Sequence, residues 1–299
     1  MEIRTVCVVG AGFMGSQIAL QAAVHGCRVH QYDVDASAFE TSSESQLALL
    51  DDQSRAGVID AAGCEGALAR LNRTVDLAEA AGDADLVIEA VREDLEVKRD
   101  VFQKLDACCP ARTILATNSS SIRISRIESA TRRADRVLNT HFVEPIWRHN
   151  FVELMRGSST SDAVFECVRT FMRSINVLPI IVRREHTGFV FNRLWRVLKK
   201  ESLRIVDQGV ATHEDVDRTW MIQMDTPLGP FARMDRVGLD VVRDIEQVYF
   251  EESGDPTDKP PQLLLEKIER GELGIKTGRG FYEYPQPRYE ADDFLATSS

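Results

Sequence analysis

The segment TVCVVGAGFMGSQIA, residues 5–19, constrains the fold of this chain more than any other part of the sequence. A β-branched run leads directly into three glycines spaced as Gly-x-Gly-x-x-Gly, and a helix-forming stretch follows them. In this context Gly10 permits a tight turn, Gly12 lets a pyrophosphate approach the backbone, and Gly15 lets the helix pack on the strand. The segment therefore predicts a dinucleotide-binding strand–turn–helix unit.

An acidic residue, Asp33, ends the second β-branched run, CRVHQYD. A carboxylate at this place accepts hydrogen bonds from the hydroxyls of an adenosine ribose and repels a 2′-phosphate. The next two residues, Val34 and Asp35, supply no arginine for such a phosphate. The sequence therefore predicts NAD rather than NADP, bound by the glycine loop with Phe13 and Met14 at the start of the helix, where N–H groups face the phosphates.

Strand-like and helix-like segments alternate through the first half of the chain. This alternation predicts an α/β fold with a parallel, doubly wound sheet of the Rossmann type. After about residue 184 the apolar residues follow helical spacing, and no further strand is expected. We therefore expect a cofactor-binding domain over residues 1–183 and a smaller all-helical domain over 184–299, with a poorly ordered tail after Pro285. The predicted strands lie at residues 5–10, 27–33, 84–91, 112–118, 136–142, 151–157 and 175–182.

The overall composition is that of a globular protein. Of the 299 residues, 43% are hydrophobic and 28% charged, and no apolar run is long enough to span a membrane. The six cysteines form no C-x-x-C pair and no metal-ligand cluster with histidine, so free thiols and no metal are expected. The net charge of −11 argues against nucleic-acid binding, which needs a basic face. Because the first residues form a predicted strand rather than a cleavable signal, a cytoplasmic location is expected.

Two histidines and two glutamates gather in NTHFVEPIWRHNFVEL, residues 139–154. Histidine suits proton exchange at neutral pH, and a carboxylate on its second ring nitrogen fixes the tautomer. His141 and Glu153 could therefore be an acid–base pair, or they could be structural and surface residues of two strands. The glycine loop favours the acid–base pair, because hydride transfer from an alcohol requires a group that takes the hydroxyl proton. His149 gains no comparable role.

Several motifs, in order along nearly the whole chain, resemble those of the L-3-hydroxyacyl-CoA dehydrogenase family. GAGFMGSQIA resembles the cofactor loop, VIEAVREDLEVKRDVFQKLD the Glu–Ala–x–x–Glu–x–x–x–x–Lys segment, and TNSSSIRI the Asn–Thr–Ser–Ser motif. THFVEPIWRHNFVEL resembles the His–Phe–Phe–Asn–Pro segment that ends in Val–Glu, and TGFVFNRL the Pro–Gly–Phe–x–x–Asn–Arg motif. DTPLGPFARMDRVGLD and GIKTGRGFYEY resemble motifs of the helical half. The resemblance implies an NAD-dependent enzyme acting at C3 of a 3-hydroxyacyl thioester.

The resemblance also assigns roles to single residues. His141 corresponds to the general base and Glu153 to the carboxylate that orients it. Ser120 and Asn192 correspond to residues that contact the reacting oxygen, although each could instead cap or bridge backbone groups.

Three more residues, Glu89, Lys98 and Asn118, are expected on the cofactor side of the site. Glu89 ends a predicted core strand, which favours a supporting role near the nicotinamide. Lys98 could serve the cofactor, or it could pair with Asp94 on a solvated helix face.

The chain departs from the family mainly in EPIWRHN. Glu144 replaces an asparagine and adds negative charge beside the pocket, whereas Trp147 and Arg148 could narrow the acyl channel or bind a polar acyl substituent. We therefore expect a short or polar 3-hydroxyacyl group carried by CoA or by an acyl carrier protein, or else a free hydroxy acid. A catalytically silent relative is the remaining alternative. The resemblance further implies a homodimer through helix faces in WRVLKKESLRIV and LDVVRDIEQVYF.

Overall fold

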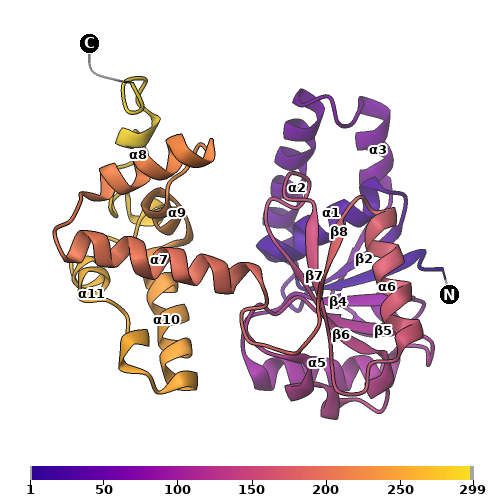
Figure 1. The fold of residues 1–299 in the computed structure, drawn as a ribbon. Helices are drawn as coiled ribbons and strands as arrows, with labels where there is room; N and C mark the ends of the chain where they lie inside the picture. Colours follow the sequence, from indigo (N-terminus) through magenta and orange to yellow (C-terminus); the bar gives the residue numbers. More distant parts are fainter. Residues whose placement is uncertain (1, 297–299) are drawn as a thin grey trace. The chain divides into compact units, whose positions relative to one another are not determined.

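The structure, a computed structural model, describes residues 2–296. The chain divides between Val190 and Phe191 into two compact units, and Figure 1 shows the elements of each. The first unit is built on an eight-stranded sheet of order β3-β2-β1-β4-β5-β6-β7-β8. This Rossmann-like sheet, followed by a helical unit, confirms the predicted fold class. The strands are β1 (Thr5–Val9), β2 (Arg28–Tyr32), β3 (Leu71–Thr74), β4 (Leu86–Glu89), β5 (Ile114–Thr117), β6 (Val137–Phe142), β7 (Phe151–Arg156) and β8 (Leu178–Val182).

Two details of the sheet differ from the sequence prediction. β7 runs antiparallel to β6, so the sheet is not wholly parallel. The segment 143–150 between these strands is too short for the crossover helix that a parallel pair requires. β3 was missed because only Leu71 of its residues LNRT is buried, and the segment shows no apolar alternation.

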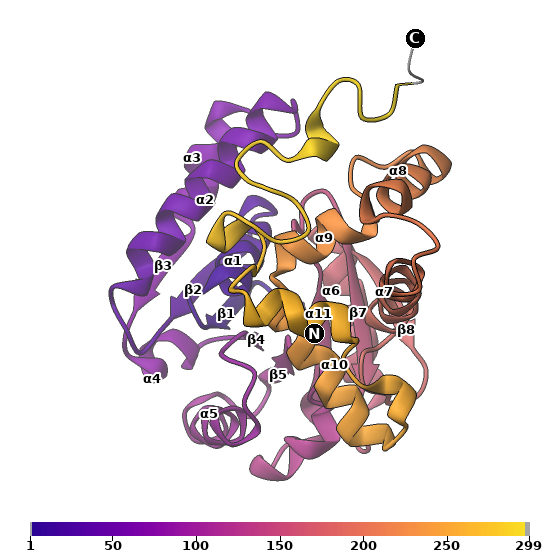
Figure 2. The same cartoon turned by 90° about the vertical axis from the view of Figure 1, so that its left-hand side faces the viewer.

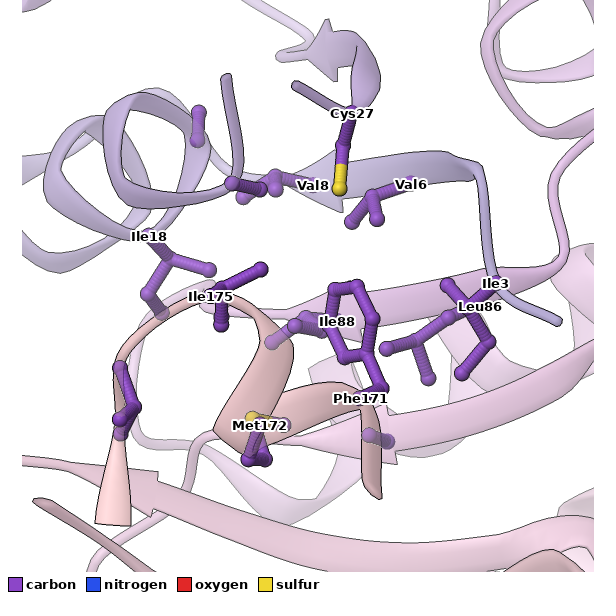
Figure 3. Packing of buried hydrophobic residues seen from close by; sticks show 14 of the residues in the cluster. Ile3, Val6, Val8, Ile18, Cys27, Leu86, Ile88, Phe171, Met172 and Ile175 are labelled. Carbon is purple, nitrogen blue, oxygen red and sulfur yellow. The ribbon is translucent and has the colours of Figure 1, made fainter. Parts of the chain in front are cut away.

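Alternating side chains of the strands give the sheet two apolar faces, as the pleat requires. The helices of this unit are α1 (Phe13–Val24), α2 (Ala38–Arg55), α3 (Ala61–Ala69), α4 (Leu77–Ala81), α5 (Leu95–Cys108) and α6 (Asp162–Ser174). Val6 and Val8 of β1 point to one face, where they pack with residues of α1 and α6 such as Ile18 and Phe171 (Figure 3). Cys7 and Val9 point to the other face, which is covered by α4 and α5.

The second unit is a set of helices (Figure 2). Its buried side chains form a separate apolar core. The core contains Leu203, Met221 and Phe231, each less than 5% exposed. Across residues 2–296, no helix combines the length and the apolar character needed to cross a bilayer. The helices are α7 (Phe191–Asp207), α8 (His213–Met224), α9 (Pro230–Val237), α10 (Leu239–Ser253) and α11 (Gln262–Glu269).

The segment after Pro285 packs against the second unit, so the expectation of a poorly ordered tail was wrong as far as Ala296. Tyr289 and Phe294 are 8% and 1% exposed, and Arg218 Nε donates a 2.7 Å hydrogen bond to the carbonyl of Phe294. The expectation weighed the polar majority of the segment and overlooked these two aromatic side chains, whose burial offsets the entropy of ordering the chain. Residues 297–299 lie outside the described part.

Candidate active site

Each of the three glycines in the loop between β1 and α1 is a glycine for a different structural reason. Gly10 has φ +111°, and a Cβ there would lie 2.7 Å from the carbonyl oxygen of the residue that follows β4. A Cβ on Gly15 would lie 2.0 Å from the oxygen of Gly10. Apart from Gly12 itself and its two chain neighbours, no heavy atom of the described residues lies within 4 Å of the position that a Cβ on Gly12 would take. Open space at Gly12, beside the first turn of α1, fits the pyrophosphate of a dinucleotide. Phe13 is 64% exposed there, whereas Met14 packs against the core.

A cavity of about 500 Å³ adjoins the glycine loop and fits the adenosine half of the cofactor. Asp33 lies in its wall, and Asp33 Oδ2 accepts a 2.7 Å hydrogen bond from the N–H of Ala11. This bond holds the carboxylate at the end of β2. Arg92 and Lys104 also line the cavity. Sequence reasoning missed both, because it considered only the residues next to Asp33.

Glu89 and Lys98 form a buried ion pair, with side chains 0% and 1% exposed and 2.7 Å between Nζ and Oε1. Glu89 Oε2 also accepts a 2.6 Å hydrogen bond from Thr117 Oγ1 at the end of β5. The alternative that Lys98 pairs with Asp94 on a solvated helix face was therefore wrong. Asp94 instead caps α5 through the N–H groups of its first turn, and Lys98 points inward because the buried Glu89 needs a counter-ion.

The loop that follows β5 carries Asn118 and Ser120. Thr117 pairs in parallel with Asn139, so this loop begins at the level of His141 on the neighbouring strand β6. Asn118 Oδ1 accepts a 2.9 Å hydrogen bond from the N–H of Phe142, the residue after His141. Ser120 is half-buried in the same loop. The register of two strands thus brings two predicted site residues to the end of the sheet where His141 lies.

Glu93 is a residue of this region that sequence reasoning did not assign. It lies in the turn between β4 and α5, and its Oε1 accepts hydrogen bonds from the hydroxyls of Ser119 and Ser121. Its Oε2 lies 3.3 Å from Lys98 Nζ. The available signal was the second glutamate of EAVRE, which belongs to the quoted motif but was given no role.

His141 and Glu153 lie directly opposite each other on the antiparallel strands β6 and β7. His141 Nδ1 lies 2.9 Å from Glu153 Oε2, and the two residues are 7% and 1% exposed. A carboxylate buried to this extent needs hydrogen-bond donors. The imidazole supplies one, and the N–H of Val190 supplies a second to Glu153 Oε1 at 2.8 Å.

Phe189 covers the histidine from the segment that precedes the second unit. Its ring centroid lies 5.0 Å from that of His141, and Phe189 is 2% exposed. Its φ of +52° is unusual for a residue with a side chain and costs on the order of 1 kcal/mol or more. The packing on His141 and the neighbouring bond from Val190 to Glu153 are what hold this backbone in place.

The stretch EPIWRHN connects β6 to β7 next to the pair. Glu144 and Arg148 are exposed and Trp147 is half-buried, with the Arg148 guanidinium 4.6 Å from the Trp147 ring centroid. His149, which gained no role from the sequence, has a structural one: its Nδ1 lies 2.7 Å from the carbonyl oxygen of Glu144 and closes the turn. Asn192 is the second residue of α7 and half-buried, in a different unit from the other predicted site residues.

Comparisons with known proteins agree along the whole chain. Residues 5–186 match the NAD-binding domain of 3-hydroxyacyl-CoA dehydrogenase, and residues 188–284 match its C-terminal domain. A probable 3-hydroxybutyryl-CoA dehydrogenase of Bacillus subtilis is 36% identical, covering 96% of this chain and 99% of the relative. A 5-formyl-3-hydroxy-2-methylpyridine 4-carboxylate 5-dehydrogenase of Mesorhizobium japonicum is 30% identical, covering 97% and 93%.

A solved structure of the same kind of enzyme also matches this chain. The (S)-3-hydroxybutyryl-CoA dehydrogenase of Ralstonia eutropha matches with a TM-score of 0.88 at 33% identity, over 95% of this chain and all of that one. The two matching domains follow each other in the order that the motifs imply. The chain belongs to the 3-hydroxyacyl-CoA dehydrogenase family and is an NAD-dependent oxidoreductase of that type.

Proposed function

We propose that this enzyme interconverts the C3 hydroxyl and ketone of a short or polar 3-hydroxyacyl-CoA, with His141 as the acid–base residue. The observation that carries the proposal is the buried His141–Glu153 hydrogen bond at the end of β6. Bound NAD supplies the hydride acceptor in the oxidative direction. The acid–base residue must then take the hydroxyl proton while the hydride leaves carbon.

The geometry of the pair specifies which nitrogen acts. Because Nδ1 faces Glu153, Nε2 is the ring nitrogen that can take the proton of the substrate. The Glu153 carboxylate fixes this tautomer and stabilises the imidazolium that forms. In the reductive direction the same imidazolium donates its Nε2 proton to the developing alkoxide.

Two polar side chains are proposed to hold the reacting oxygen. Ser120, in the loop after β5, can donate a hydroxyl hydrogen bond, and Asn192, near the start of α7, can donate from its amide. Asp33, the open space at Gly12 and the first turn of α1 are proposed to bind the adenosine and pyrophosphate of NAD. The buried Glu89–Lys98 pair supports this region from within the protein, and Asn118 supports it through its bond to β6.

The acyl group is proposed to meet the segment between β6 and β7. Trp147 with the Arg148 guanidinium stacked on it gives a flat, cationic edge that suits a polar or acidic substituent. The exposed Glu144 carboxylate adds negative charge to the same segment, which disfavours a long apolar chain there. A free carboxylated substrate is the second candidate, favoured by this arginine and by the relative named as a dehydrogenase of a pyridine carboxylate. An acyl-carrier-protein thioester is the third.

A substrate panel distinguishes these candidates. Purified enzyme with NAD is offered 3-hydroxybutyryl-CoA, a 3-hydroxydicarboxylyl-CoA, the same acyl groups on an acyl carrier protein, and the free hydroxy acids. We expect the highest kcat/KM on a CoA thioester with a polar acyl group, and Arg148→Ala should lower it for the dicarboxylyl substrate only. Turnover confined to carrier-linked or free acids would reject the CoA assignment. No turnover on any compound would favour a catalytically silent relative.

We also propose that the enzyme is a homodimer formed by the second unit. On α10, Val241, Ile245 and Val248 lie on one helical face and are 41%, 39% and 40% exposed. On α7, Leu194 and Val197 are 68% and 69% exposed. Apolar residues that recur at helical spacing on a surface are typical of a protein interface.

A further inference from the structure

The turn that follows β4 lies directly against the glycine loop. A Cβ on Gly10 would lie 2.7 Å from the carbonyl oxygen of Ala90 and 3.3 Å from the backbone nitrogen of Val91. The N–H of Ala90 also donates a 2.8 Å hydrogen bond to the carbonyl of Val9, at the end of β1. A side chain that extends from this turn can therefore reach the place where the pyrophosphate is proposed to lie.

Arg92 is the first residue of this turn that has a charged side chain. It is exposed, and it lines the cavity of about 500 Å³ together with Gly10 and Gly12. Among the contacts of residues 2–296, no hydrogen bond or ion pair involves its guanidinium. The next residue, Glu93, does not neutralise it, because that carboxylate is bound to Lys98 and to serine hydroxyls of the turn after β5.

The other charged groups in the described wall of this cavity already have partners. Lys104 Nζ lies 2.7 Å from Asp100 Oδ2, and Asp33 accepts backbone N–H bonds on both of its carboxylate oxygens. Of the two cations that line the cavity, Arg92 is therefore the one without an ion-pair partner among the described residues. Its planar guanidinium stays charged at neutral pH and matches the oxygens of a phosphate group.

The glycine loop by itself does not neutralise a pyrophosphate. Both phosphates of NAD are anionic, and residues 10–16, GAGFMGS, contain no basic side chain. The loop offers N–H groups and the positive end of α1, which is equivalent to roughly half an elementary charge. The remaining counter-charge has to come from another segment of the chain.

We propose that the Arg92 guanidinium binds the pyrophosphate of NAD and supplies the counter-charge that the glycine loop lacks. The proposal rests on the proposed function, in which the pyrophosphate lies beside Gly12 and the first turn of α1. It goes further by adding a charged side chain from a second turn, at a position that the Glu–Ala–x–x–Glu segment leaves unspecified. Because the pyrophosphate does not react, this contact strengthens NAD binding equally in the ground state and in the transition state.

The variants Arg92→Ala and Arg92→Lys test the contact, with NAD affinity measured by calorimetric titration. We expect NAD to bind about 10- to 100-fold more weakly to Arg92→Ala, the range for a lost hydrogen bond to a charged group, and Arg92→Lys to lie between that variant and wild type. Salt should weaken NAD binding by wild type more than by Arg92→Ala, because it screens an exposed cation. KM for NAD should rise in Arg92→Ala, whereas kcat at saturating NAD should not fall. Arg169→Ala is the matched control, because it removes the same charge from α6, where Arg169 pairs with Glu166.

Fragments of the cofactor locate the contact. ADP-ribose keeps the pyrophosphate and adenosine lacks it, so Arg92→Ala should weaken ADP-ribose as it weakens NAD and leave adenosine within about 2-fold of wild type. An equal loss for adenosine, or an unchanged affinity for NAD, would overturn the proposal. A much larger loss for NADP than for NAD would also overturn it, because the guanidinium would then lie at the ribose 2′-phosphate. These titrations involve no turnover, so an enzyme that binds NAD but oxidises no hydroxyacyl thioester would reject the proposed function, a separate result.

Discussion

The hydrogen bond between His141 Nδ1 and Glu153 Oε2 decides which nitrogen of the histidine can do chemistry. The donors to Glu153 include this imidazole, on Oε2, and the N–H of Val190, on Oε1. Glutamine has a single side-chain oxygen, so in Glu153→Gln either the imidazole or the N–H of Val190 must face an NH₂ group. If that donor is His141, the imidazole is forced into the tautomer whose Nε2 already carries a proton and cannot accept another.

We therefore expect kcat to fall about 100-fold or more in Glu153→Gln with NAD affinity unchanged, as for other orienting carboxylates. Steady-state kinetics and NAD titration measure both quantities. Glu166→Gln is the control, because Glu166 lies on α6 and pairs with Arg169. A Glu153→Gln enzyme with wild-type kcat would contradict the assigned tautomer.

Asp217 in the second unit predicts a pH dependence of stability. Burial raises its pKa to about 6, against the opposing hydrogen bonds from the N–H groups of Phe231 and Ala232. An unfolded aspartate has a pKa near ~3.9, so between about pH 4 and pH 6 the folded state binds more protons than the unfolded state. The contribution of Asp217 to the free energy of unfolding is present below pH 4 and is lost as pH rises through 6.

Asp217→Asn cannot ionise and should not show this loss. The free energy of unfolding of Asp217→Asn minus that of wild type should therefore rise between about pH 4 and pH 6 and level off above it. Urea unfolding at several pH values measures the difference, which cancels the effects of other carboxylates. A difference that is constant across this range would show that Asp217 does not titrate as inferred.

Single residues also show where sequence reasoning ends. The position of Lys98 four residues after Asp94 fits a surface ion pair, but the capping role of Asp94 and the buried Glu89 turn the lysine inward. Glu93 went unassigned because its serine partners are brought close by two separate turns, one after β4 and one after β5, which no local spacing reveals. The assignment of the His141–Glu153 pair rested on the family resemblance, and the structure places the two residues opposite each other because β6 and β7 pair antiparallel.

Among structural elements, the β1–α1 unit contains glycines with two different roles. Gly15 is required for folding, whereas Gly12 leaves room for a ligand. A Cβ on Gly15 would meet the Gly10 oxygen at 2.0 Å, whereas a Cβ on Gly12 would meet no described atom within 4 Å beyond its chain neighbours. Gly12→Ala should therefore keep the melting temperature of wild type and weaken NAD binding by at least about 10-fold, by blocking the approach of the pyrophosphate. Gly15→Ala should lower the melting temperature itself.

Calorimetry and NAD titration on both variants test this contrast. Unchanged NAD affinity in Gly12→Ala would mean that the pyrophosphate does not approach this part of the loop. An equal loss of stability in both variants would mean that Gly12, too, serves packing.

The strands that could be predicted from the sequence are those whose own residues form an apolar run. β1, β4 and β5 are buried on both faces and stand out as β-branched segments, so the sheet could be predicted. β3 has one buried residue and no pattern, and the direction of β7 depends on the length of the connection rather than on its own residues. The segment after Pro285 was wrongly expected to be poorly ordered, because most of its residues are polar. Its two aromatic residues Tyr289 and Phe294 nevertheless pack in the core of the second unit.

At the scale of the whole molecule, the proposed dimer depends on the apolar face of α10. Ile245 lies at the middle of that face, between Val241 and Val248. A glutamate there would bury an unpaired charge in the interface, so Ile245→Glu should shift the enzyme from dimer to monomer at micromolar concentration. Val210→Glu is the control, since Val210 is 71% exposed outside the helices. Analytical ultracentrifugation measures both, and a monomeric wild type would contradict the dimer.

The proposed function depends above all on acid–base catalysis by His141 on a 3-hydroxyacyl-CoA with NAD. The most direct measurement is the single-turnover rate of NADH formation from 3-hydroxybutyryl-CoA by wild type and by His141→Ala, each saturated with NAD. We expect a rapid rate for wild type and a loss of about 1,000-fold or more in His141→Ala, with NAD affinity unchanged, because a general base is removed. Equal rates in the two proteins would contradict it.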